Sequence, residues 1–170
     1  MSVSISDYSG FLKNVYEILP KGAFLTTENN GKVNTMTIGW GGFGFKWGIP
    51  TAEVMVRESR FTKEALDKNL EFTLTFPLDS SMKEALSYCG KNSGRDTDKI
   101  ADCNLTVIDS KELKTPVIAC KSIVMECKVL SYMPMFENTT NSDILDKWYN
   151  SGDLHTVYLA EVVACYELNE

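Results

Sequence analysis

Residues 22–40, GAFLTTENNGKVNTMTIGW, contain the pattern that decides the fold class. Two runs rich in β-branched and aromatic residues, 22–28 and 32–40, lie on either side of Asn29-Asn30-Gly31. Asn and Gly accept the positive φ angles that a tight turn needs. The stretch therefore predicts two antiparallel strands joined as a hairpin.

Further strands are predicted along the rest of the chain. Runs at 52–57 and 71–76 have strand character, and a shorter run lies near 104–108. Two long runs, 116–133 and 154–168, are rich in β-branched and aromatic residues and suit the wall of a barrel.

Helices are predicted singly, between strands. Residues 7–19 carry apolar side chains at helical spacing and stop at Pro20. Thr62 is expected to cap a short helix over 63–69, because its hydroxyl can accept from the first free amides. The polar segment 138–153 is expected to contain a helix from Ser142 to Tyr149.

One more helix is predicted from a capping box, Ser81-Met82-Lys83-Glu84, and is expected to end at Gly90. Strands outnumber helices, and neither a repeat nor a linker interrupts the chain. We therefore expect residues 1–170 to form one mainly β (α+β) domain, a barrel with peripheral helices rather than a doubly wound sheet.

The composition excludes several classes of protein. The chain has 170 residues, a net charge of −6 and no basic stripe, which disfavours nucleic-acid binding. Nowhere does it approach the roughly 20 consecutive apolar residues of a membrane helix, and it lacks a signal-peptide pattern. We expect a cytoplasmic protein. Five cysteines without a CxxC pair and one histidine predict reduced thiols and no metal site.

Three short stretches carry candidate chemistry. The first, residues 34–48, is a strand followed by a glycine–aromatic loop. It is compatible with a simple strand and turn with stacked aromatic rings. Taken alone it favours that interpretation, but it is also compatible with backbone amides and Thr hydroxyls that face a flat polar ligand, covered by Trp40 or Trp47.

The second stretch, 57–62, places two arginines and two hydroxyls where a helix begins, which suits either a phosphate or an ordinary capped helix. The third stretch, 89–99, is a turn whose chemistry explains Gly90 and Gly94. A turn does not require its excess of hydrogen-bond donors, which are Lys91, Asn92, Ser93, Arg95 and Lys99.

Taken in order, NTMTIGWGGFG, VRESRFT, YCGKNSGRDTDK and DLHTVYLAEV resemble the flavin reductase-like, FMN-binding split-barrel family, and within it the flavoredoxin branch. The resemblance extends from about Gly22 to Tyr166. It implies a split β-barrel homodimer with one FMN per subunit, at or near the subunit interface.

The resemblance also implies site residues. Asn34, Thr35, Met36 and Thr37 would lie along the isoalloxazine edge, with Trp40 nearby. The phosphate and ribityl chain would be held by Ser59, Arg60 and Thr62, and the polar end would be completed by Asn92, Ser93, Gly94, Arg95 and Lys99. His155 would lie close to the flavin as the candidate catalytic residue.

Two features depart from the family pattern. Glu58 stands where many relatives carry proline, so its carboxylate is expected to point away from the phosphate site or to pair with Arg57 or Arg60. The loop at 138–153 matches no motif, and we expect a substrate or partner to be selected there.

Three functions fit this interpretation. The first is an oxidoreductase whose FMN is reduced by NADH or NADPH. The second is an electron-transfer protein whose FMN is reduced by a redox protein partner. The third is a storage or regulatory barrel that binds FMN or another planar cofactor, such as haem with His155 as its ligand, without turnover.

Overall fold

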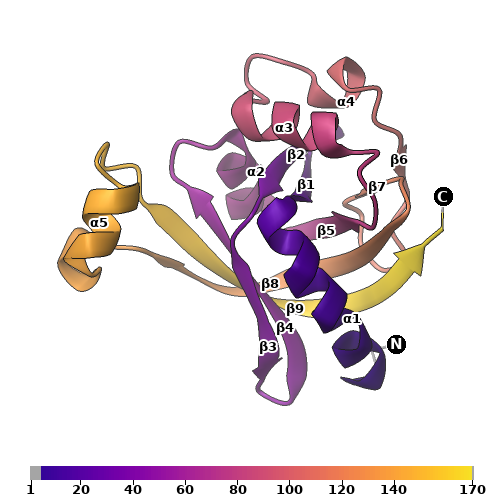
Figure 1. The fold of residues 1–170 in the computed structure, drawn as a ribbon, viewed down its shortest axis with the longest axis horizontal. Helices are drawn as coiled ribbons and strands as arrows, with labels where there is room; N and C mark the ends of the chain where they lie inside the picture. The colour runs from indigo at the N-terminus through magenta and orange to yellow at the C-terminus, as the bar shows by residue number, and fades with distance from the viewer. Residues whose placement is uncertain (1–4, 170) are drawn as a thin grey trace.

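A single antiparallel sheet of seven strands dominates the computed structural model, which describes residues 5–169 (Figure 1). The strand order is β2-β1-β5-β8-β9-β4-β3. The strands are β1 (Ala23–Asn29), β2 (Lys32–Ile38), β3 (Gly41–Lys46), β4 (Ile49–Arg57), β5 (Glu71–Pro77), β8 (Ser122–Pro134) and β9 (His155–Leu168). A separate pair is formed by β6 (Val107–Ile108) and β7 (Val117–Ile118).

The sheet curls into a split barrel. Its two edge strands, β2 and β3, are connected by only Gly39 and Trp40. A link of this length spans on the order of 10 Å, so the two edges must approach each other. Within the described residues they are not hydrogen-bonded to each other, and the barrel stays open between them. The mainly β fold with peripheral helices is confirmed.

Five α-helices are described, and they lie outside the barrel. They are α1 (Ile5–Ile18), α2 (Phe61–Asn69), α3 (Lys83–Lys91), α4 (Lys99–Asp102) and α5 (Ser142–Trp148), with short 3-10 turns η1 (Leu19–Lys21) and η2 (Glu137–Thr139). α1 contacts β4, β5 and β9, α2 contacts β1, and α3 and α4 contact β2. Figure 1 shows α5 standing apart, where the long β8–β9 hairpin leaves the barrel.

Two apolar clusters hold these layers together. Alternation along β1 sends the fully buried Phe24 and Leu25 to opposite sides of the sheet. Leu25 packs inside the barrel with Leu74 and Met125. Phe24 packs with Leu86 of α3 in the outer cluster. Both faces of β1 are therefore buried, which fixes its register against β2 and β5.

The hairpin predicted at 29–31 is confirmed, with Asn30 and Gly31 both at positive φ. The glycine–aromatic segment predicted as a loop is instead strand β3, which pairs with β4. Its turn lies at Trp47 and Gly48, at φ of 53° and 80°. The predicted strand at 116–133 is also interrupted: the short β7 and the long β8 belong to different sheets.

Both predicted helix caps are wrong. The N-cap of α2 is Arg60 rather than Thr62, and that of α3 is Met82 rather than Ser81. Neither cap forms a side-chain hydrogen bond. Thr62 lies inside the first turn of its helix, where its hydroxyl accepts from Asn34 (2.9 Å). The Thr62 hydroxyl, which the sequence pattern predicts to cap the helix, is therefore used in a tertiary contact with β2.

The five cysteines form no disulfide with one another, and Cys89, Cys120 and Cys127 are buried. No helix within residues 5–169 is long and apolar enough to cross a bilayer.

Candidate functional site

Two adjoining cavities open beside the split of the barrel. The first, of about 250 Å³, is called the polar pocket; its lining is Met36, Ser59, Arg60, Phe61, Thr62, Asn92, Ser93, Gly94, Arg95, Asp96 and Lys99. The second, of about 230 Å³, is called the aromatic pocket; its lining is Met36, Thr37, Ile38, Gly39, Trp40, Met55, Arg57, Arg60 and His155. Met36 and Arg60 line both, so the cavities form one elongated site.

Strand pairing explains why residues so distant in the sequence meet here. β4 and β9 are antiparallel neighbours, and their register places Arg57 directly opposite His155. The chain then turns from Arg57 into α2, which brings Arg60 to the same end of the sheet. β2 contributes Met36 to the junction between the two cavities.

The polar pocket carries an excess of positive charge. Arg60, Arg95 and Lys99 line it, against the single carboxylate of Asp96. Lys99 is 5% exposed, and burial lowers its pKa. Within the described residues its ammonium donates one hydrogen bond, to the Cys89 carbonyl (3.1 Å), although it has three hydrogens. A buried cation with one neutral partner favours an anion in the adjoining cavity.

The start of α2 adds to the positive electrostatic potential of the polar pocket. No side chain caps the helix, and Phe61 and Thr62 of its first turn line the polar pocket. Uncapped first-turn amides and the helix dipole both favour negative charge. Together with the buried Lys99 ammonium, they make the pocket suited to a phosphate group.

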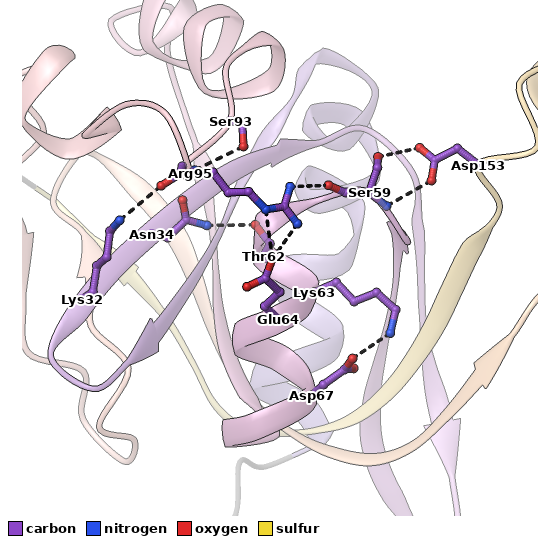
Figure 2. A network of polar contacts seen from close by, with 11 residues as sticks. Lys32, Asn34, Ser59, Thr62, Lys63, Glu64, Asp67, Ser93, Arg95 and Asp153 are labelled. Carbon is purple, nitrogen blue, oxygen red and sulfur yellow. Dashed lines mark hydrogen bonds and ion pairs between the residues drawn. The ribbon is translucent and has the colours of Figure 1, made fainter.

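Arg95 fastens the loop after α3 to the start of α2, as Figure 2 shows. Its guanidinium donates to the Ser59 carbonyl (2.9 Å) and forms an ion pair with Glu64 (2.6 Å). The adjacent Gly94 packs so closely that a Cβ there would lie 2.8 Å from Cδ1 of Phe61. The loop therefore lies against α2 as a tightly fitted wall of the polar pocket.

A carboxylate from the other side of the site holds Ser59. Asp153 accepts from the Ser59 backbone amide (3.1 Å) and from its hydroxyl (2.6 Å) (Figure 2). Arg57 donates to the carbonyls of Asp153 (2.5 Å) and Trp148 (3.0 Å). These contacts, which we call the clasp, tie the loop after α5 to the turn between β4 and α2.

The aromatic pocket has a wall of stacked rings. Trp40 lies edge-on to Trp148, with 4.8 Å between ring centroids, and 5.7 Å from the ring of His155. Nδ1 of His155 is 2.7 Å from the Tyr149 hydroxyl. Burial and the positive charge of Arg57 lower the pKa of His155 to about 4, so the ring is neutral at physiological pH.

The structure brings most of the predicted site residues together. All eight residues expected at the phosphate end line the polar pocket: Ser59, Arg60, Thr62, Asn92, Ser93, Gly94, Arg95 and Lys99. Three of those expected at the ring, Met36, Thr37 and Trp40, line the aromatic pocket together with His155. Their roles toward a cofactor stay predictions.

Asn34 and Thr35 line neither cavity. The Asn34 amide donates to Thr62 (2.9 Å), and the fully buried Thr35 hydroxyl is 3.1 Å from that of Thr26. These contacts, with α2 for Asn34 and with β1 for Thr35, hold both side chains away from the two cavities. Glu58 points away from the polar pocket, and it binds Thr156 (2.5 Å) and Lys63 (3.5 Å) rather than either arginine.

Several residues of the site were missed by sequence reasoning. Met55 lies two residues before Arg57, so strand alternation could have placed both on the face that lines the aromatic pocket. Trp148, Tyr149 and Asp153 belong to the loop that matched no motif. Nothing in the local sequence identifies Trp40 and Ser59 as partners of Trp148 and Asp153, because they lie far away along the chain. Tyr149 and His155 are only six residues apart, but no motif links them.

A split barrel with a cation-lined pocket beside an aromatic one defines a class of protein that can hold an elongated ligand with an anionic end and a flat end. Residues 19–170 match the family model described as the flavin reductase like domain. The chain belongs to this family, whose members are oxidoreductases.

Several solved structures share this fold. A flavoredoxin from Methanosarcina acetivorans is 28% identical with a TM-score of 0.67; the match covers 86% of this chain and 67% of that one. The flavin reductase of styrene monooxygenase from Pseudomonas putida S12 is 22% identical with a TM-score of 0.63, covering 86% and 78%. Nitrilotriacetate monooxygenase component B from Bacillus cereus is 18% identical with a TM-score of 0.69, covering 100% and 82%. No curated protein sequence matches the chain significantly.

Proposed function

We propose that this chain is an FMN-dependent oxidoreductase that is reduced by NADH or NADPH. The phosphate of FMN occupies the polar pocket, and its isoalloxazine ring occupies the aromatic pocket. The observation that carries this proposal is the buried ammonium of Lys99, which has one carbonyl partner and lines a cavity continuous with the aromatic pocket. FMN has its anionic group and its ring at opposite ends, as such a site requires.

The residues of the chain suit the group in three ways. Lys99, Arg60 and the first turn of α2 provide charge and donors for a phosphate. Met36, shared by the two pockets, supports the middle of an elongated ligand. Trp40 provides a wall for a flat ring, and the neutral His155 provides a polar group that does not titrate near pH 7.

When bound, FMN supplies hydride or single-electron transfer, which no side chain in this site can perform. The chain contributes orientation and a defined electrostatic environment around the ring. It also limits access, because Trp148 at the end of α5 packs on Trp40 at the rim of the aromatic pocket.

A second candidate is an electron-transfer protein whose FMN is reduced by a redox protein partner. The similarity to a flavoredoxin favours this alternative. It differs from the leading proposal in the electron donor and not in the cofactor.

An anaerobic spectral titration of the FMN-loaded protein separates the two candidates. The leading proposal predicts that NADH or NADPH abolishes the flavin absorbance. If both nicotinamides leave the absorbance unchanged while a ferredoxin-type donor removes it, the electron-transfer candidate is correct. A protein that takes up no FMN contradicts both.

The proposal extends to assembly and location. Beyond Lys128, β8 is no longer paired with β5, and this outer part carries the exposed Leu130, Tyr132 and Met133, followed by the exposed Phe136. Apolar groups on a strand with a free edge are suited to burial against a second copy of the chain. A homodimer formed through this surface, in the cytoplasm, is the state in which we expect the protein to work.

A further inference from the structure

One polar contact at the aromatic pocket involves a residue outside the family-implied site. Tyr149, which directly follows α5, places its hydroxyl 2.7 Å from Nδ1 of His155. Both side chains are buried, and their rings meet edge-on with 5.5 Å between centroids. The contact is thus a short hydrogen bond in a place from which bulk water is largely excluded.

The direction of this hydrogen bond follows from the available acceptors. The hydroxyl has one hydrogen, and its other neighbour is the Met135 sulfur at 3.6 Å. An imidazole nitrogen is a much stronger acceptor than a thioether, and it is also closer. The guanidinium of Arg57 lies 5.0 Å from the centre of the Tyr149 ring, and its positive charge makes the phenol a better donor. Tyr149 therefore donates to Nδ1.

The other ring nitrogen faces a different environment. Within residues 5–169 no group forms a hydrogen bond with Nε2. This nitrogen is not among the fully buried polar atoms that lack a partner, and the ring lines the aromatic pocket. A neutral imidazole that accepts at Nδ1 must carry its proton on Nε2. That proton is then available to whatever occupies the pocket.

We propose that Tyr149 is a positioning residue that holds His155 in the Nε2–H tautomer, so that the aromatic pocket presents a fixed, neutral hydrogen-bond donor. The charged groups around the ring support its neutral form. Arg57 from β4 and Arg60 from the turn before α2 oppose a proton on the imidazole, and Asp153 from the loop before β9 favours one. Two cations against one carboxylate, in a buried position, leave the ring uncharged.

This inference deepens the proposed function and rests on it for its consequence. A neutral donor binds an electron-rich acceptor atom of the ligand without giving up a proton. His155 then acts by hydrogen bonding and not as a general acid, and the rate of flavin reduction between pH 6 and 9 does not follow a histidine titration. Removing the Tyr149 hydroxyl leaves the imidazole free to rotate and to change tautomer.

The chain is well suited to a direct test, because His155 is its only histidine. We suggest ¹⁵N labelling of histidine in the full-length chain and long-range ¹H–¹⁵N correlation spectra from pH 4 to 9, first without flavin and then with saturating FMN. The expected spectrum at pH 7 has a protonated Nε2 and an unprotonated, hydrogen-bonded Nδ1. A protonated Nδ1 would overturn the proposal.

Tyr149→Phe keeps the ring and removes the hydroxyl. Loss of a donor to Nδ1 destabilises the neutral imidazole, so the proton affinity of His155 should rise roughly tenfold, the worth of one hydrogen bond, and the Nδ1 resonance should move. The control is Tyr16→Phe, which removes a hydroxyl that donates a hydrogen bond to the Phe43 carbonyl, in a different part of the fold. Unchanged His155 resonances and proton affinity in Tyr149→Phe would refute the positioning role.

The flavin-free spectra separate this inference from the proposed function. If FMN fails to bind while the Nε2–H tautomer is present, the proposed function is wrong and the role of Tyr149 in fixing the ring stands. If FMN binds while His155 carries its proton on Nδ1, the proposed function stands and the inference is wrong.

Discussion

Gly94 shows how strictly a single residue shapes the polar pocket. An added Cβ would lie 2.8 Å from Cδ1 of Phe61 and 3.0 Å from Cγ of Asn34, well inside van der Waals contact. Asn34 cannot retreat freely, because its amide donates to Thr62. The wall formed by residues 92–95 therefore depends on the absence of a side chain at this position.

We predict that Gly94→Ala weakens FMN binding at least about tenfold and destabilises the fold by about 1–3 kcal/mol, as expected for overpacking. Flavin fluorescence titration and thermal unfolding measure the two effects. Gly10→Ala, in α1 with nothing within 4 Å of the new Cβ, is the matched control and should be neutral or stabilising. Equal behaviour of the two variants would contradict the close packing of the loop.

His155 predicts a pH dependence of stability. Its pKa in the folded protein is about 4, against an ordinary value of 6.5, so between these values the unfolded chain binds more protons. Stability is therefore fully present above pH 6.5 and falls as the pH is lowered toward 4, by up to about 3 kcal/mol from this group.

Urea unfolding of the wild type and of His155→Gln across pH 4–8 isolates this effect, because the carboxyl groups are common to both proteins. The free energy of unfolding of the variant should lose less between pH 6.5 and 4 than that of the wild type. Parallel curves would show that the imidazole is not held in its neutral form.

At the scale of elements, the clasp couples the loop after α5 to the polar pocket. Asp153 occupies both donors of Ser59, and Arg57 binds the carbonyl of Asp153 and that of Trp148 at the end of α5. A phosphate bound near Ser59 meets the Asp153 carboxylate, which either repels it or moves away. We therefore expect a phosphate in the polar pocket to shift this loop, and with it the contact of Trp148 with Trp40.

We predict that Asp153→Asn tightens FMN binding by a few-fold, because it removes one negative charge beside the phosphate while Asn keeps a carbonyl for the Ser59 amide. The control is Asp146→Asn, which removes an exposed charge from α5. Titration with FMN at low ionic strength gives the comparison. Weaker FMN binding by Asp153→Asn alone would mean that the clasp supports the site rather than competing with the ligand.

Elements that depend on neighbours in the sequence were predicted well. The hairpin at 29–31 follows from turn chemistry, and the last long strand follows from its β-branched and aromatic run. The helix α5 also lies where the sequence predicts one. The failures have a shared cause. The sequence predicts a loop where β3 forms and a cap at Thr62, because the pairing of β3 with β4 and the bond of Thr62 to Asn34 are long-range contacts.

Some features of the candidate site can likewise be predicted from local sequence, and others cannot. Its two donor-rich loops were found from local composition, and they line one pocket. The contacts of Tyr149 with His155 and of Asp153 with Ser59 depend on how β4 pairs with β9 and on how the loop after α5 folds back. No periodicity or motif in the sequence encodes these pairings.

For the molecule as a whole, the part of β8 beyond Lys128, which is not paired with β5, predicts that two copies of the chain associate. Light scattering coupled to size exclusion should give twice the chain mass at micromolar concentrations. Met133→Glu places a charge among the exposed apolar groups and should give the monomer mass, whereas Lys147→Glu on α5 should leave the dimer intact. A wild-type protein that is monomeric throughout would exclude this surface as a dimer interface.

The proposed function depends on a phosphate that is held by the buried charge of Lys99. Titration of the flavin-free protein with FMN and with riboflavin, for the wild type and for Lys99→Met, measures what this charge contributes to binding. Because a charge-assisted hydrogen bond is worth about 1.5–3 kcal/mol, FMN should bind the wild type at least roughly tenfold more tightly than riboflavin. Lys99→Met should remove most of that difference without weakening riboflavin. Equal affinities of the wild type for FMN and riboflavin would show that the polar pocket does not hold the phosphate.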